Sequence, residues 1–204
     1  MDWTPTAPHD LPVQVAGWIA AAPGLSRVAI DGAPCTTPDE FAATLLAPLH
    51  AAGRPAVQLR AELFWRDASL RFEMGREDVE SYLTWLDAEA LRREVLDPAV
   101  TVGRYLPSLR DPATNRSTRA APRTLGPNGI LLVSGSLLLG RDLPFDRTVH
   151  LAMSPAARRR HTPDGEAWTL PAYDSYDRVT RPVETADVVV KLDDPRHPAL
   201  RRRI

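Results

Sequence analysis

The sequence contains only one cysteine, Cys35, and only one lysine, Lys191, among its 204 residues. A single cysteine excludes an intrachain disulfide framework. Basic and acidic residues number 25 and 26, which leaves a formal net charge of −1. A protein that binds a nucleic-acid polymer or a membrane surface usually carries a basic excess. The charge balance therefore predicts neither kind of partner.

Long apolar runs are also missing. No run approaches the roughly 18 residues that a membrane-spanning helix needs, and the N-terminus lacks the basic segment and apolar core of a signal peptide. We therefore expect a cytoplasmic protein. Proline, in contrast, is abundant, with 20 residues, about twice the average usage of roughly 5%. Much of the chain is consequently expected to be loop.

The remaining sequence alternates between short apolar runs and helical patterns. Residues 1–8 are interpreted as a loose leader and residues 9–204 as a single α/β domain. Apolar spacing and the positions of proline and glycine predict helices at 9–23, 38–52, 86–98, 154–161 and from 173 to Pro182. Branched and apolar runs predict strands at 27–30, 56–64, 130–139, 148–153 and 187–192. Residues 99–128 are expected to form a long loop or a short hairpin.

The segment from residue 27 to residue 64 is a predicted strand, helix and strand in succession. A unit of this kind implies that its two strands are parallel. Ligands of open parallel sheets bind at the carboxyl ends of the strands. The turn after the first strand is therefore the first place to look for a site.

That turn lies in VAIDGAPCTT, residues 28–37, and has the outline of a phosphate-binding loop. The motif G-x-x-x-x-G-K-[ST] wraps phosphates with backbone N–H groups and supplies a lysine to them. Here Cys35 takes the lysine position and Pro34, which has no N–H group, takes that of the preceding glycine. Gly32 lies three residues before Cys35, where the motif places its first glycine six before the lysine. The phosphate cradle is thus shortened and has lost its positive charge.

Five segments in this order resemble the uridine kinase family of P-loop nucleoside kinases, in particular its actinobacterial members. They are VAIDG with its two threonines, ELFWR (62–66), LDAEALRREVLDP (86–98), ILLVSG (130–135) and the C-terminal stretch 173–195. The resemblance covers residues 27 to 200. It implies an α/β fold with a doubly wound parallel sheet and helices on both faces. For working members it also implies ATP, Mg²⁺ and transfer of the γ-phosphoryl group to a nucleoside 5′-hydroxyl.

The resemblance also implies roles for individual residues. The nucleotide phosphates would lie against Asp31, Gly32, Cys35, Thr36 and Thr37, and under a lid that contains Arg158, Arg159 and Arg160. Mg²⁺ would be held by Thr36 and Ser134, although Ser134 stands where the family places an acidic residue. Glu62 would be the catalytic base, with Leu63 in place of a second carboxylate. The nucleoside would contact Trp65, Arg104 and Tyr105.

Several of these residues have a purely structural alternative. Thr36 or Thr37 can cap the helix at 38–52 instead of binding Mg²⁺, and Asp31 can be a turn residue before glycine. The three arginines suit phosphate but also suit a solvated helix end. Cys35 near a helix start can be a nucleophile, yet a small, half-buried side chain is the favoured interpretation. Trp65, Trp85 and Trp168 can stack on a base or belong to the core.

Two functions follow from these patterns. The first is an ATP-dependent kinase of a nucleoside or other small-molecule hydroxyl, impaired by its altered loop, because a fixed positive charge at the transferring phosphate is a large part of catalysis. The second is a catalytically inactive pseudokinase that binds a nucleotide, a nucleoside or a protein partner, which includes a second copy of the chain. A third, weaker alternative uses Cys35 or Glu62 for different chemistry.

Overall fold

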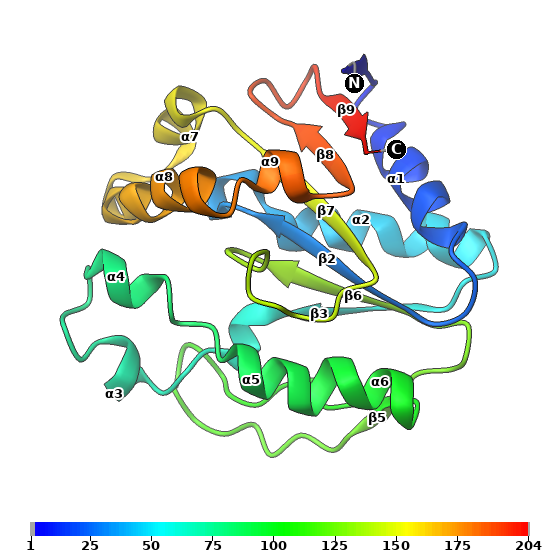
Figure 1. Ribbon diagram of the computed structural model, residues 1–204, viewed down its shortest axis with the longest axis horizontal. Coiled ribbons are helices and arrows are strands. Elements are labelled where there is room, and N and C mark those ends of the chain that lie inside the picture. Colours follow the sequence, from blue (N-terminus) through cyan, green and yellow to red (C-terminus); the bar gives the residue numbers. More distant parts are fainter. Residues whose placement is uncertain (1–2, 204) are drawn as a thin grey trace.

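The computed structural model describes residues 3–203, and a mostly parallel β-sheet forms its centre (Figure 1). The strand order is β1-β9-β8-β7-β2-β6-β3. Strands β8, β7, β2, β6 and β3 are parallel to one another, whereas β9 is antiparallel to both of its neighbours. The bounds of these strands are Thr4–Pro5 (β1), Ser26–Gly32 (β2), Ala56–Arg60 (β3), Ile130–Gly135 (β6), Arg147–Ala152 (β7), Val188–Lys191 (β8) and Ala199–Arg202 (β9).

Helices cover both faces of this sheet, as predicted for a doubly wound fold. The α-helices are Leu11–Ala20 (α1), Pro38–Ala51 (α2), Ala68–Arg71 (α3), Val79–Tyr82 (α4), Ala88–Leu91 (α5), Asp97–Thr101 (α6), Pro155–His161 (α7), Leu170–Val179 (α8) and Pro182–Thr185 (α9). Shorter 3₁₀ segments span Pro34–Thr36, Ala61–Phe64 and Asp164–Thr169, and a π-helical segment spans Arg92–Leu96. Helices α1 and α2 lie on one side of the sheet, and α5, α6 and α8 lie on the other (Figure 1).

Alternation along the strands divides the core between the two faces. Val28 and Ile30 of β2 pack with α1 and α2, whereas Ala29 belongs to the cluster that contains α5 and α8. All three side chains are fully buried. Apolar burial on both faces explains why the central strands are continuous hydrophobic runs in the sequence.

The edges of the sheet differ most from the predictions. Thr4 and Pro5 pair with β9, so this part of the expected loose leader belongs to the sheet. Strand β9 was not predicted, because ALRR is short and half polar. The predicted strand at 56–64 ends at Arg60, and that at 130–139 ends at Gly135. Within residues 99–128 the structure has a loop with a two-stranded ladder of Arg104–Tyr105 (β4) and Arg123–Thr124 (β5).

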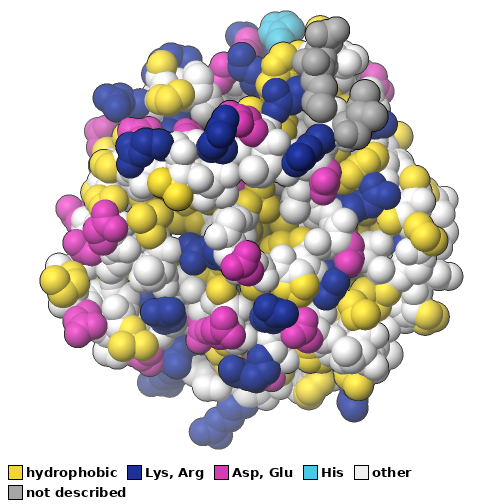
Figure 2. All heavy atoms as spheres, in the orientation of Figure 1, with side chains coloured by type: hydrophobic (Ala, Val, Ile, Leu, Met, Phe, Trp, Pro, Cys, Tyr) yellow, Lys and Arg dark blue, Asp and Glu magenta, His cyan; other side chains and the backbone are white. Residues whose placement is uncertain are grey.

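The surface carries charges of both signs. In the orientation of Figure 1, Lys and Arg side chains are intermixed with Asp and Glu side chains on the visible face (Figure 2). This mixture agrees with the formal net charge of −1. Among residues 3–203, no helix is both long enough and apolar enough to cross a bilayer.

Candidate functional site

The turn between β2 and α2 lies at the carboxyl edge of the sheet, where the sequence predicted a phosphate site. Residues Pro34–Thr36 form a 3₁₀ turn that closes on itself. The N–H group of Thr36 donates to the carbonyl of Ala33 (2.8 Å), and that of Thr37 donates to the carbonyl of Pro34 (2.9 Å). Proline has no N–H group, so Pro34 offers none. A phosphate cradle needs N–H groups that point at the ligand, and here two of them are satisfied inside the turn.

Thr36 and Thr37 both have a structural role in the turn. Thr36 is buried, and its hydroxyl donates to the carbonyl of Ala33 (2.7 Å). Thr37 occupies the cap position of α2 in a left-handed conformation (φ 49°), but its side chain makes no capping hydrogen bond. Gly32 is required by close approach, because a Cβ atom there would lie 2.4 Å from the Thr36 Oγ1. The turn is therefore a tight, internally bonded corner.

Cys35 is the lone cysteine and is half-buried. Burial raises the pKa of its thiol above the ordinary value, although the Thr162 hydroxyl and the Arg158 guanidinium oppose this rise. The thiolate is the nucleophilic form of cysteine. This environment favours the interpretation of Cys35 as a half-buried small side chain over that of a nucleophile.

Asp31 is fully buried near the end of β2, so it is not a residue of an exposed turn. Its Oδ1 accepts from the N–H group of Leu138 (2.9 Å). Its Oδ2 accepts from Nδ1 of His150 (2.7 Å) and from the hydroxyl of Tyr176 (3.0 Å). Both carboxylate oxygens of Asp31 are therefore hydrogen-bonded to protein groups.

Ser134 lies where the sequence placed it, near the carboxyl end of β6, but its hydroxyl is hydrogen-bonded to protein groups. It is fully buried, and its hydroxyl donates to Oδ1 of Asp39 (2.5 Å). Gln58 donates to the Ser134 hydroxyl (2.9 Å) and to the Asp39 carbonyl (2.9 Å). Within residues 3–203, no group of three His, Cys, Asp or Glu side chains is arranged to hold a metal ion. The Thr36 and Ser134 hydroxyls, which the resemblance assigned to Mg²⁺, both donate to protein oxygens, so these two residues fit the implied Mg²⁺ site poorly.

The three consecutive arginines of α7 have different environments. Arg159 and Arg160 are exposed. Arg158 is buried, and its guanidinium pairs with Asp174 (2.8 Å) and Asp177 (2.9 Å) of α8. A guanidinium thus lies close to the turn, but two carboxylates already neutralise it.

A cleft of about 460 Å³ opens beside the turn, along the ends of β3 and β6. Four carboxylates line it, and within the described part of the chain no lysine or arginine does. The carboxylates belong to Asp39, Glu40, Glu62 and Glu166. Like charges repel, and low-dielectric walls strengthen the effect. The cleft therefore disfavours a triphosphate and suits a neutral or cationic ligand.

The same cleft also has an aromatic wall. Trp65, Tyr82, Trp85 and Trp168 line it. Their rings pack edge to face, with centroids 5.2 Å apart for Trp65 and Trp85 and 5.3 Å apart for Tyr82 and Trp168. Arrangements of this kind favour a rigid wall. Carboxylates that accept hydrogen bonds and aromatic rings that pack on a flat face together suit a sugar, a nucleoside or an organic amine.

The predicted site residues are only partly brought together. Glu62 and Trp65 both line the cleft, and Glu62 pairs with Arg60 (3.1 Å). Arg104 and Tyr105 do not line it. Tyr105 is buried in the hydrophobic core, and Arg104 is exposed on β4.

Sequence reasoning missed the contributions of Asp39, Glu40, Glu166 and Tyr82 to the cleft. Asp39 and Glu40 carried a signal, because they begin a helix at the carboxyl edge of a parallel sheet, where ligands bind. Acidic residues in the first turn of a helix also stabilise the helix start, so their charge alone does not indicate a site. Glu166 lies in a proline- and glycine-rich stretch whose position relative to the sheet could not be derived from its sequence.

Solved structures match this arrangement of a mostly parallel sheet with a β-turn-helix corner at its carboxyl edge and helices on both faces. The first is described as a possible uridine kinase from Bacillus stearothermophilus (19% identity, 87% of this chain and 96% of that one, TM-score 0.72). The second is a putative fructose transport system kinase from Silicibacter sp. TM1040 (22%, 89% and 95%, 0.56).

A third matching structure is the YGR205w protein (8% identity, 98% of this chain and 100% of that one, TM-score 0.58). No protein-family model and no curated protein matches the sequence. At these identities the structural likeness establishes the fold, which confirms the predicted fold class.

Proposed function

We propose that the chain is a uridine kinase-like protein that has lost phosphoryl transfer, or retains it only in strongly impaired form, and that uses its acidic cleft to bind a neutral polyhydroxyl ligand such as a nucleoside. The observation that carries the proposal is the closed turn, in which the N–H groups of Thr36 and Thr37 donate to the carbonyls of Ala33 and Pro34. Phosphoryl transfer depends on positioning and neutralising the phosphates. The turn offers little of either.

The cleft supports the second half of the proposal. A ribose hydroxyl can donate to Glu62 or Asp39, and a base can pack against Trp65 or Trp168. In water-poor clefts of this size, a few polar groups set orientation and aromatic walls supply contact area. The absence of lysine and arginine from the described lining fits a ligand without phosphate.

Uridine and uridine triphosphate form a matched pair for the test, because they share base and ribose and differ in the charged phosphates. Isothermal titration calorimetry should detect uridine binding and much weaker binding of the triphosphate. Glu62→Gln should reduce the affinity for uridine several-fold, because it replaces a charged acceptor, worth about 1.5–3 kcal/mol, with a neutral one, worth about 0.5–1.5 kcal/mol. Glu89→Gln, at an exposed position of α5 outside the cleft, serves as the matched control.

A kinase assay with ATP, Mg²⁺ and uridine separates this proposal from its alternative. An active enzyme with a modified loop would retain Glu62 as the base, and Glu62 does line the cleft. We expect turnover at background. A turnover number in the range of about 1 s⁻¹ or more, typical of kinases, would favour the active enzyme. If neither nucleosides nor other polyols bind, the remaining form of the pseudokinase hypothesis is a protein partner or a second copy of the chain.

A further inference from the structure

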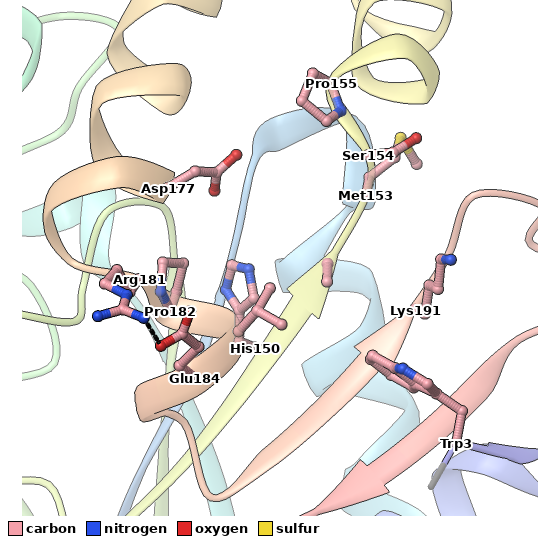
Figure 3. A pocket seen from close by; sticks show the side chains of 12 residues that line it. Trp3, His150, Met153, Ser154, Pro155, Asp177, Arg181, Pro182, Glu184 and Lys191 are labelled. Atoms are coloured by element: carbon pink, nitrogen blue, oxygen red, sulfur yellow. Dashed lines mark ion pairs between the residues drawn. The ribbon is translucent and has the colours of Figure 1, made fainter. Parts of the chain in front are cut away.

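A second cavity, of about 370 Å³, lies between β7, β8 and α9 and shares no lining residue with the acidic cleft. His150 forms part of its floor, and Figure 3 shows the imidazole ring between Pro182 and Glu184 on one side and Lys191 on the other. The side chain of His150 is only 7% exposed. The hydrogen-bonding partners of its two ring nitrogens therefore decide what the imidazole can offer to a ligand in the cavity.

The position of His150 follows from strand register. His150 of β7 is the direct neighbour of Asp31 of β2, and side chains at paired positions of adjacent strands point to the same face. Both side chains therefore point away from α1 and α2 and toward α8. There Tyr176 completes the group, with its hydroxyl 3.0 Å from the Asp31 carboxylate.

The hydrogen bonds around Asp31 fix the proton on His150. The Tyr176 oxygen accepts from the N–H group of Leu139 (2.9 Å), so its own proton is free to go to Asp31. Burial, followed by the negative charge of Asp31, raises the pKa of Tyr176 and keeps it protonated. An ionised carboxylate can only accept. Nδ1 of His150 must then donate to an ionised Asp31, and when the ring carries this one proton, Nε2 presents a lone pair.

His150 lines the cavity, so the accessibility of Nε2 decides whether a ligand can reach the lone pair. Across residues 3–203, the only buried side-chain nitrogen or oxygen without a hydrogen-bond partner is Nε of Arg158. No described residue forms a hydrogen bond with Nε2 of His150. Because Nε2 is not among the buried atoms without a partner, it must be accessible, and His150 lines the cavity. The acceptor is therefore nearly buried, oriented by Asp31 and unused by the described part of the protein.

The other lining groups define what can bind there. Apolar side chains form most of the wall, namely Ala152, Met153, Pro155, Pro182 and Val183. The charged lining residues are already paired: Asp177 with Arg158 (2.9 Å), Arg181 with Glu184, and Lys191 with Asp193 (3.4 Å). A ligand thus meets apolar contacts, ion-paired charged groups at exposed side chains, and the nearly buried imidazole of His150.

We propose that this cavity is a second ligand site, for a small, largely apolar molecule with one hydroxyl group that donates its hydrogen bond to Nε2 of His150. Asp31 is the positioning residue, because it holds the imidazole in the tautomer that accepts. The site is independent of the acidic cleft, so either can fail without the other.

Phenol and anisole are the probes, since they have similar shape and only phenol has a donor. Ligand-observed NMR should show that the native protein binds phenol at least about fivefold more tightly than anisole, the factor expected for one hydrogen bond. His150→Asn can keep a side-chain N–H donor near the position of Nδ1 and thus the bond to Asp31, but it removes Nε2. This variant should bind both probes within about twofold of each other. His161→Asn, at an exposed position of α7 outside the cavity, should retain the preference.

A measurement on the native protein tests the same claim without a variant. The ¹⁵N shifts of the His150 ring should identify the Nδ1–H tautomer, and added phenol should move the Nε2 resonance but not the Nδ1 resonance. Equal affinity for the two probes, binding of neither, or an Nε2–H tautomer would overturn the proposal.

Discussion

Replacing Gly32 with alanine is the sharpest perturbation of the turn that the structure describes. An alanine Cβ would lie 2.4 Å from Oγ1 of Thr36, 3.0 Å from Cβ of Leu151 and 3.2 Å from the Leu151 carbonyl. The Thr36 hydroxyl cannot simply rotate away, because it is buried and donates to Ala33. In an open phosphate loop, the threonine hydroxyl would point to a ligand and would not meet this methyl group.

The magnitude follows from the contacts. Overpacking a close-packed site typically costs about 1–3 kcal/mol, and three contacts this short place Gly32→Ala near the upper end, at about 2–3 kcal/mol. Thr36→Ala alone should cost about 1 kcal/mol for one lost hydrogen bond. In the Thr36→Ala background the shortest contact disappears while those with Leu151 remain. Gly32→Ala should then cost at least about 1 kcal/mol less than it does alone.

Urea denaturation of the four proteins of this cycle measures the free energy of unfolding, with circular dichroism as the signal. Gly17→Ala is the matched control, because nothing lies within 4 Å of a Cβ at that helical position. It should be neutral or stabilising by up to about 1 kcal/mol. If Gly32→Ala costs the same with and without Thr36, the hydroxyl does not occupy the corner and the closed turn is wrong.

Three further predictions concern the surroundings of the turn. Iodoacetamide should alkylate Cys35 more slowly at pH 8 than it alkylates free cysteine, because burial raises the pKa of the thiol despite the opposing effects of Thr162 and Arg158; equal rates would contradict this. Arg158→Met should lower the free energy of unfolding in urea by about 1–3 kcal/mol, because it leaves two carboxylates of α8 unpaired. This is less than the roughly 3–5 kcal/mol for a fully buried pair, since water reaches both carboxylates; no change would show that the ion pairs do not contribute to stability. For Asp146, burial raises the pKa of the carboxyl but hydrogen bonds from Arg27 outweigh it, so the pKa is lowered overall. Its contribution to stability is therefore present above the ordinary pKa of about 3.9 and lost as pH falls through the lowered value. Asp146→Asn should lose less stability than the native protein over that interval, and parallel pH profiles would contradict the assignment.

The central strands and the β-α-β unit could be predicted from the sequence because their signals are local. Val28 to Ile30 form a continuous apolar run, and Pro38 with acidic residues after it marks the start of α2. The helix predicted at 86–98 was right in place but wrong in detail. A π-helical segment interrupts it at 92–96, and Pro98 lies in the first turn of α6, which begins at Asp97, rather than ending the helix. These details depend on tertiary packing, which overrides local propensity.

The candidate site was less accessible to sequence reasoning. Pro34 and Cys35 revealed a shortened, uncharged loop, but not that the Thr36 and Thr37 N–H groups are satisfied inside it. The partners of Asp31 lie more than a hundred residues away in sequence and meet it only through strand register and α8. A buried Asp and a buried His in predicted neighbouring strands would have been the only available signal. Strand order, which sets that neighbourhood, cannot be derived from a single sequence.

Calorimetric titration with Mg·ATP tests the central claim most directly, since the claim is that the turn between β2 and α2 cannot cradle a triphosphate. Titration of the native protein into the millimolar range should give no heat beyond dilution, which corresponds to binding weaker than about −4 kcal/mol. A micromolar dissociation constant, lost again in Gly32→Ala, would show that the turn opens to hold the phosphates and would contradict the account.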